Sequence, residues 1–367
     1  MRATFLHTTT LSRLRLRSQP VRLGIGILAA IVLVVTFTRL VSLRSVLLRL
    51  EHLNIPLALL AGGVFLGAYT VRALRWRRLL TPRPVTRTRA ILIYQVAIFV
   101  NWLLPIRGGE LVKSLLLRRL DDIPVSESLP TVAMDKLMDL LPAIILLVLL
   151  PFLPVHLSRP LWMLLLLVVV ILLCSLAFVA VAARRRDVAM RFLDRLFALF
   201  PTALRRRVEP FAMRFVDALL GLVARPRLLA IAAMYTMAAV ALDALFALLA
   251  FWAVGAFVNY PEILFGYTLY NLAYILPTPP GQIGSNEVIG LLVFSGLFYI
   301  SRNAVGAMFL FSHPWTALLM TISGLVSLSV MGLNLRAAMS MSDQRAVERE
   351  APVVPPSTLP DVEGANP

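Results

Sequence analysis

The sequence predicts an all-α, polytopic membrane protein with about six full spans and two short, broken helical hairpins. Hydrophobic residues make up 59% of the chain. Several uninterrupted apolar runs reach the length of about 18 residues at which a helix crosses a bilayer. Because these runs are continuous rather than alternating, they exclude a membrane β-barrel. Two further apolar runs are too short for an easy crossing, and proline and glycine interrupt each of them.

The positions of the runs define the elements in order. The six predicted full spans are residues 23–41, 55–71, 129–152, 161–183, 228–251 and 304–333. They form a single transmembrane domain, 23–335, between a basic N-terminus, 1–22, and a proline-rich tail, 340–367, that we expect to be disordered. Residues 187–224 carry apolar side chains at helical spacing with arginines opposite, which predicts amphipathic helices along the cytoplasmic interface.

Basic residues set the predicted orientation. The net charge is +17, and segments 1–22, 72–89 and 184–227 together hold 23 arginines. The loops predicted on the other side hold only Arg44, Arg49, Arg159 and Arg302. Because cytoplasmic loops accumulate arginine and lysine, we expect a multi-pass protein of the plasma or inner membrane with both termini in the cytoplasm.

The arginine-rich segment 72–89 has two interpretations at this stage. It surrounds Trp76 and includes Arg72 and Arg75. It is either a cytoplasmic anchor with an interfacial tryptophan or a site for anionic lipid headgroups. The arginines lie between apolar runs, so they indicate topology rather than nucleic-acid binding.

Two hairpins share one plan. The first, about residues 90–119, is broken by Pro105, Gly108 and Gly109, and its second arm opens on Glu110. The second, about 264–299, is broken by a proline- and glycine-rich stretch before Glu287. In the predicted orientation the first enters from the cytoplasm and the second from outside, which is typical of inverted-repeat transporters.

The hairpin tips are the predicted substrate site. A helix that starts at membrane depth exposes N–H groups, and its dipole favours an anion. We expect the two tips to face one another around a phospholipid headgroup, with Arg107 opposite its phosphate. The predicted substrate-binding residues are Arg107, Gly108, Gly109, Glu110, Gly281, Gly284, Ser285, Asn286, Glu287, Asn271 and Tyr274.

Five of these residues also have a structural interpretation. Arg107 could pair with Glu110 or Asp139 and only fasten the fold. Glu110 and Glu287 could cap the helices that they open. Asn271 and Tyr274 could belong to a packing stripe on one helical face.

Charged residues inside the spans form a second predicted set. The candidates for coupling or ion pairing are Asp135, Lys136, Asp139 and Asp243. Asp135 and Asp139 lie one helical turn apart, so with Lys136 they could instead be a salt-linked helix start. Asp243 could be a proton or ion site, or a packing residue near Tyr235 or Asn271.

Templates for catalysis are absent from the sequence. It contains no GxSxG, HExxH or phosphate-binding GxxxxGK[ST] pattern, and Cys174 is its only cysteine. We expect no catalytic residue, no metal and no cofactor, and we expect membrane lipids with anionic or lipid-linked headgroups as partners. The leading function is lipid translocation. The alternatives are a membrane-embedded transferase on lipid-linked sugars and a non-transporting scaffold whose hairpins enclose no cavity.

Three pieces of the chain carry a family resemblance: NWLLPIRGGELVKSLLLRR, VSESLPTVAMDKLMDLL and LPTPPGQIGSNEVIGLLVFSGL. In this order they resemble the lysylphosphatidylglycerol synthase transmembrane family, also called the flippase-like family. The family motifs PxRxGE, (E/D)(R/K)xxD and PGxxGxxE correspond to Pro105–Glu110, Asp135–Asp139 and Pro280–Glu287. The resemblance covers about residues 20–335. It implies movement of a lipid, or a lipid-linked sugar, between leaflets.

Two departures from the family pattern limit what the resemblance implies. The last span of the family often carries an arginine where this chain has Ser312–His313. We interpret His313, which precedes Pro314, as a structural residue at a kink. The chain also continues into a short polar tail rather than a soluble aminoacyl-transferase domain, so we do not expect it to make lysyl-lipids.

Overall fold

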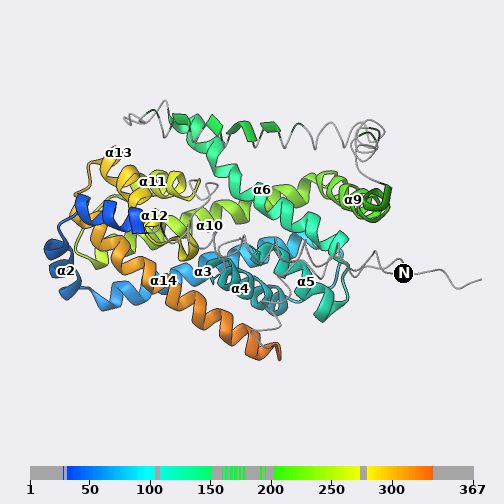
Figure 1. Ribbon diagram of the computed structural model, residues 1–367, viewed down its shortest axis with the longest axis horizontal. Coiled ribbons are helices and arrows are strands. Elements are labelled where there is room, and N and C mark those ends of the chain that lie inside the picture. The colour runs from blue at the N-terminus through cyan, green and yellow to red at the C-terminus, as the bar shows by residue number, and fades with distance from the viewer. Residues whose placement is uncertain are drawn as a thin grey trace, which may run out of the picture.

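Every regular element that the structure describes is a helix (Figure 1). The computed structural model describes residues 31–103, 108–150, 202–272 and 279–333, together with Leu28 and scattered positions between 159 and 195. The helix Ile31–Leu40 comes first. It is followed by α2 (Leu43–Glu51), α3 (Ile55–Leu79), α4 (Arg87–Leu103), α5 (Gly109–Asp121), α6 (Val125–Leu149), α9 (Thr202–Val223), α10 (Pro226–Ala253), α11 (Tyr260–Leu272), α12 (Ser285–Gly290), α13 (Gly296–Phe298) and α14 (Arg302–Val330).

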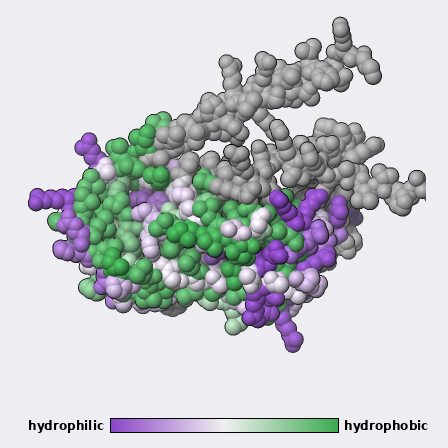
Figure 2. Space-filling view, turned by 90° about the horizontal axis from the view of Figure 1, so that it is seen from below, coloured by the Kyte–Doolittle hydropathy of each residue, from purple (hydrophilic) through white to green (hydrophobic). Residues whose placement is uncertain are grey.

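The surface has the character of a membrane protein. Figure 2 shows an apolar surface between two polar ends. Large apolar side chains such as Leu59 of α3, Met234 of α10 and Val326 of α14 are exposed on it. So much contiguous apolar surface is stable in lipid rather than in water. The predicted all-α membrane class is therefore confirmed.

Fewer helices than predicted qualify as spans in the described part of the chain. By length and composition, α3, α10 and α14 are long and apolar enough to cross a membrane. The helix Ile31–Leu40 and α2 qualify only as a pair, bent by 83°. The helix α6 has 25 residues, but its apolar part carries three charged residues, Asp135, Lys136 and Asp139, and it is not among the qualifying helices. Most of the predicted span 161–183 lies outside the described residues, as do residues 1–22 and the tail 340–367.

Small residues allow the long helices to pack closely. The helix α3 packs most extensively on α10, where Ala61 and Phe65 lie against Phe246 and Leu249. A Cβ atom on Gly62 would lie 2.9 Å from the indole nitrogen of Trp315 on α14. Small side chains let helix backbones approach in a membrane, where packing rather than the hydrophobic effect drives association.

The first hairpin consists of α4 and α5, and residues 104–107 of its turn lie outside the described residues. The two arms touch directly at Gly109, where a Cβ atom would lie 2.0 Å from the carbonyl oxygen of Ala97. The Gly109 N–H donates to Oδ1 of Asn101 at 2.8 Å. An α4 side chain therefore caps the start of α5, which satisfies a backbone donor that has no helical partner.

The second hairpin consists of α11 and an irregular returning arm; residues 273–278 lie outside the described residues. The returning arm begins with the 3-10 turn Pro280–Gln282, continues through α12 and a π-helical turn, Leu291–Ser295, and ends at α13. The backbone has positive φ at Gly281, Gln282 and Gly284. In Figure 1, α5 of the first hairpin lies on one side of the middle of the molecule, and α11 to α13 lie towards the opposite end.

Two predicted boundaries are wrong, and both errors concern charged residues. The helix α3 continues to Leu79 instead of ending at residue 71, so Arg75 and Trp76 are buried helical residues and not part of a loop. The helix α6 starts at Val125, so Asp135 lies well inside it and is not at a helix start. In both cases ion pairs with neighbouring helices allow charged side chains within a helix, and a single segment does not reveal those partners.

The helix α9 covers the second half of the segment predicted to be amphipathic. Its apolar residues Leu219 and Leu222 are buried against Met134 and Met138 of α6. The apolar face of α9 therefore packs on the helical body of the protein.

Candidate functional site

Two arginines of α3 lie one turn apart and form the centre of the site. The guanidinium of Arg75 is fully buried. Its Nε donates to Oδ1 of Asp135 at 2.8 Å, and its Nη2 donates to Oδ1 of Asp139 at 2.7 Å and to the Asp135 carbonyl at 3.1 Å. Its Nη1 donates to the Thr236 hydroxyl of α10 at 2.9 Å. One side chain thus joins α3, α6 and α10.

Asp135 is the second buried centre. In addition to Arg75, its Oδ2 lies 3.2 Å from Nζ of Lys113 and accepts the Tyr94 hydroxyl at 3.4 Å. The Lys113 ammonium lies 3.9 Å from the ring centroid of Tyr94 and 5.6 Å from that of Trp76. A carboxylate and the face of an aromatic ring both stabilise a cation that has lost its hydration shell.

A more accessible group of charges lies beside this core. Glu110 contacts Lys113 at 2.8 Å and Lys136 at 2.9 Å, and it accepts from Nδ2 of Asn101 at 3.2 Å. Lys136 also lies 3.4 Å from Asp139. The side chain of Lys136 is 49% exposed, whereas that of Lys113 is only 1% exposed. Lys136 is therefore the cation of this group that a ligand could reach.

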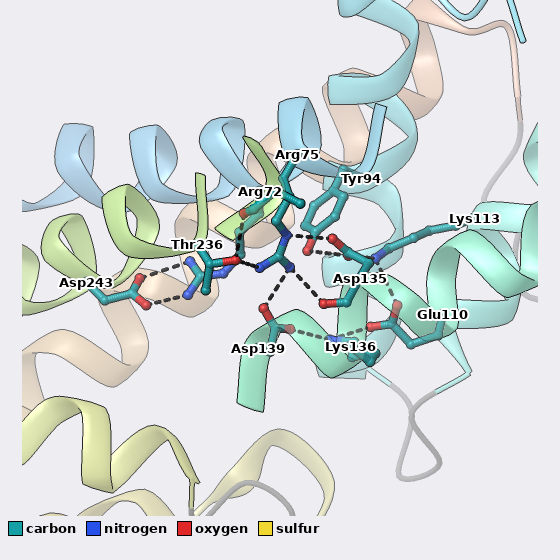
Figure 3. A network of polar contacts seen from close by, with 11 residues as sticks. Arg72, Arg75, Tyr94, Glu110, Lys113, Asp135, Lys136, Asp139, Thr236 and Asp243 are labelled. Carbon is teal, nitrogen blue, oxygen red and sulfur yellow. Dashed lines mark hydrogen bonds and ion pairs between the residues drawn. The ribbon is translucent and has the colours of Figure 1, made fainter. Parts of the chain in front are cut away.

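Arg72 and Asp243 form a further pair between α3 and α10. Nη1 of Arg72 donates to Oδ1 of Asp243 at 3.0 Å, and Nη2 contacts Oδ2. Arg72 also lies 5.3 Å from the ring centroid of Tyr69. In the described part of the chain, the contacts in Figure 3 thus join four cationic side chains to four carboxylates: Arg72, Arg75, Lys113 and Lys136 with Glu110, Asp135, Asp139 and Asp243.

A cavity of about 390 Å³ adjoins these charges. The first hairpin lines it with Asn101 and Glu110, and the second lines it with Asn271, Gln282 and Asn286. Helices α3, α6, α10 and α14 complete the wall. Both hairpins therefore reach one polar space inside a body whose outer surface is apolar.

A separate contact holds the second hairpin to α14. Nδ1 of His313 lies 2.7 Å from Oε1 of Glu287, and Nε2 lies 2.8 Å from the carbonyl oxygen of Gly281. The other carboxylate oxygen of Glu287, Oε2, is buried and has no hydrogen-bond partner among the described residues. His313 therefore has a specific polar role in addition to its place before Pro314.

The structure separates the predicted site residues into groups. Glu110, Lys136, Asp139, Asp243, Asn271 and Asn286 all line the cavity. Three further residues are buried, and each is adjacent in the sequence to a residue that lines the cavity: Asp135, Ser285 and Glu287. Gly281 supplies the carbonyl that faces His313. Gly108, Gly109 and Gly284 shape the two hairpin tips. Arg107 and Tyr274 lie outside the described residues.

Two of the structural interpretations, those of Glu110 and Asp243, are wrong. Glu110 does not cap α5, because its oxygens contact lysines and Asn101 and the N–H of Gly109 is taken by Asn101. Asp243 binds Arg72 rather than Tyr235 or Asn271. In each case a cation from a distant segment competes successfully with a neutral neighbour, because only an opposite charge offsets the cost of burying a carboxylate.

Sequence reasoning missed Lys113 and Tyr94 as site residues, and it considered Arg72 and Arg75 as a cytoplasmic anchor or a headgroup site but not as partners of the buried carboxylates. The sequence nonetheless indicated that the carboxylates in its apolar spans have cationic partners. Asp135, Asp139 and Asp243 lie in apolar spans, and carboxylates at such positions require cationic partners. The helical spacing of Arg72 and Arg75, at the end of an apolar run, made them candidates for that role.

The fold and the site define a multi-pass helical membrane protein with an internal cavity bordered by ion pairs. The family model described as "Lysylphosphatidylglycerol synthase TM region" matches residues 22–333. The chain belongs to this family, as its motifs predicted. Membership places it among membrane proteins of lipid metabolism or transport. Comparisons with curated proteins and with solved structures gave no match.

Proposed function

We propose that this protein moves a phospholipid, or a lipid-linked molecule, between the two leaflets of its membrane. The observation that carries the proposal is the cavity of about 390 Å³ to which both hairpins contribute polar side chains. Its volume lies in the range of about 300–1,000 Å³ that is typical of small-molecule sites. The headgroup would occupy this polar space while the acyl chains stay in the surrounding lipid.

The proposed architecture has about six full spans and two re-entrant hairpins inserted from opposite sides, with both termini in the cytoplasm. The position of α5 on one side of the middle of the molecule, and of α11 to α13 towards the opposite end, supports this arrangement (Figure 1). Transporters built from opposed, broken hairpins bind their substrates where the broken helices meet. The shared cavity is such a meeting place.

The charges around the cavity suggest how a headgroup is recognised. The buried pair of Arg75 and Asp135 is closed to a ligand, since both side chains are 0% exposed and Arg75 already donates four hydrogen bonds to α6 and α10. Lys136 differs, because its ammonium contacts two carboxylates while its side chain is 49% exposed. We propose that a phosphate of the headgroup binds Lys136 and partly displaces Glu110 or Asp139 from it. The N–H groups at the hairpin tips, and Arg107, are the further proposed ligands.

The non-transporting scaffold requires hairpins that pack together without a space between them. The polar cavity argues against that alternative. Filling such a space with side chains would stabilise a scaffold, because interiors are otherwise packed densely.

Transport by the purified protein tests the proposal directly. The protein is reconstituted in vesicles of phosphatidylethanolamine and phosphatidylglycerol that contain fluorescent phosphatidylglycerol, and dithionite then quenches the label in the outer leaflet. We expect wild-type protein to expose inner-leaflet label to dithionite and K136Q to slow this step at least about tenfold, the equivalent of about 1.4 kcal/mol. The control R83Q breaks an exposed ion pair with Glu127, remote from the cavity wall, and keeps the wild-type rate.

Two results decide between the parts of the proposal. If wild-type vesicles behave like protein-free vesicles with this lipid and with a lipid-linked sugar, translocation is refuted. If wild-type protein transports and K136Q matches it, translocation stands and the role of Lys136 is refuted.

A further inference from the structure

The hydrogen-bond geometry of His313 constrains the protons around it. The Gly281 carbonyl can only accept, so the ring nitrogen 2.8 Å away, Nε2, must carry a hydrogen. The contact of 2.7 Å between Nδ1 and Oε1 of Glu287 also needs a hydrogen between its two atoms. That hydrogen belongs either to an imidazolium beside a carboxylate or to a carboxylic acid beside a neutral imidazole. In both forms the pair holds one proton more than neutral histidine and ionised glutamate.

Loss of this proton is incompatible with the observed contact. A neutral ring that keeps its Nε2 hydrogen would turn the lone pair of Nδ1 towards a carboxylate oxygen 2.7 Å away. If the ring hydrogen moved to Nδ1 instead, Nε2 would face the Gly281 carbonyl with no hydrogen between them. One of the two contacts of His313 must therefore break when the pair loses its proton.

Few groups around Glu287 would stabilise its ionised carboxylate once the pair has lost its proton. The side chains of His313 and Glu287 are 13% and 10% exposed, and Oε2 of Glu287 has no hydrogen-bond partner among the described residues. The helices packed on α14 contribute charged or titratable groups to the same cavity: Tyr69, Arg72 and Arg75 from α3, Tyr94 from α4 and Asp243 from α10. The polar contacts described for these groups join them to one another, to Thr236 or to residues of α5 and α6, and not to His313.

The contact partner of Nε2 is the tip of the second hairpin. This tip has an unusual backbone, with φ of 63° at Gly281, 60° at Gln282 and 79° at Gly284. A left-handed conformation is strained for a non-glycine residue such as Gln282, so it persists only where other contacts hold it. His313 supplies one such contact, and the Ser285 hydroxyl supplies another by donating to the Gln282 carbonyl at 2.8 Å.

We infer that Glu287 and His313 form a proton-binding site that fastens the second hairpin tip to α14, and that release of the proton frees the tip. The step transfers one proton from the pair to water, and the charge of the pair falls from zero to minus one. Gln282 and His313 both line the cavity, so this step changes the cavity wall. A permanent cation at position 313 would hold Glu287 without such a switch, whereas a histidine makes the contact depend on pH.

The first experiment measures the proton itself in nanodiscs. Protein labelled with 15N-histidine is titrated from pH 5 to 9, and the His313 signal is assigned from its loss in H313Q. Infrared difference spectra report the protonated carboxyl of Glu287, assigned from its loss in E287Q. We expect one proton to leave the pair in one step, seen on the ring or on the carboxyl. A neutral ring beside an ionised Glu287 at every pH would overturn the inference.

The second experiment measures the tip. Spin labels are placed at two exposed positions, Ile283 of the tip and Leu318 of α14, in a C174S background. We expect the distance distribution of the wild type to shift between pH 5 and pH 9. The amide of E287Q can donate to Nδ1, so E287Q keeps the low-pH distribution throughout, and H313Q keeps the high-pH distribution throughout. The control H52Q changes an exposed histidine and behaves like the wild type.

The outcomes separate this inference from the proposed function. A wild-type distribution that does not change with pH, or an E287Q variant that changes as the wild type does, refutes the switch. The consequence for transport rests on the proposed function: the rate with fluorescent phosphatidylglycerol should vary with pH in the wild type and not in E287Q. If no variant transports, translocation fails while the proton and distance measurements still decide the switch.

Discussion

Replacing Arg75 by glutamine tests whether the buried charges hold the helices together. The substitution removes a fully buried guanidinium that donates four hydrogen bonds to α6 and α10. Asp135 keeps Lys113 and Tyr94, and Asp139 keeps Lys136, so neither carboxylate is left bare. Removing one partner of a buried ion pair costs about 3–5 kcal/mol. Because both carboxylates keep another cationic partner, we expect R75Q to lower the free energy of unfolding by about 3 kcal/mol, the lower end of this range.

The measurement is equilibrium unfolding in mixed micelles of a nonionic detergent and dodecyl sulfate. The matched control is R83Q, because Arg83 and Glu127 form an ion pair whose side chains are 49% and 39% exposed. Exposed pairs contribute about 0–1 kcal/mol. The double variant R75Q/D135N removes both members of the buried pair, so we expect it to cost less than the two single variants together by about 0.5–3 kcal/mol. If R75Q unfolds like R83Q, the buried network does not stabilise the fold.

Three glycine substitutions test the hairpin geometry by the same unfolding measurement. G109A should cost about 3 kcal/mol, because its Cβ would lie 2.0 Å from the Ala97 carbonyl oxygen and one arm of the hairpin must shift; a wild-type stability would contradict this close approach. G284A should cost at least about 2 kcal/mol, since its φ is 79° and its Cβ would lie 2.5 Å from Cβ of Leu33. G63A faces open space on an exposed helical surface and should be neutral, or stabilising by up to about 1 kcal/mol; a loss of stability would show that this face has a partner.

Much of the fold followed from local patterns. The long apolar runs predicted α3, α10 and α14, and the breaks around Pro105 and Pro280 predicted two hairpins. These predictions succeed because a chain in lipid must satisfy its backbone hydrogen bonds within each helix. The ends of α3 and α6 were less predictable, because charged side chains near an apolar run look the same whether they end it or continue it.

The sequence predicted which carboxylates belong to the candidate site better than it predicted their ion-pair partners. Carboxylates such as Glu110 and Asp243 were marked as unusual by their apolar surroundings, and both line the cavity. Their partners were not visible, because Arg72 and Asp243 are 171 residues apart in the sequence. The link between His313 and Glu287 was missed for the same reason, although both residues had been singled out.

The amino-acid sequence by itself determined that this protein lies in a membrane, that α3, α10 and α14 are long and apolar enough to cross it, and which family the protein belongs to. These properties depend on hydropathy, helical spacing and short motifs, and each is local along the chain. The tertiary structure alone decided which charges neutralise one another and that the two hairpins share a cavity. A buried charged side chain pairs with the nearest opposite charge in space. Helix packing, rather than position in the sequence, determines which charge that is.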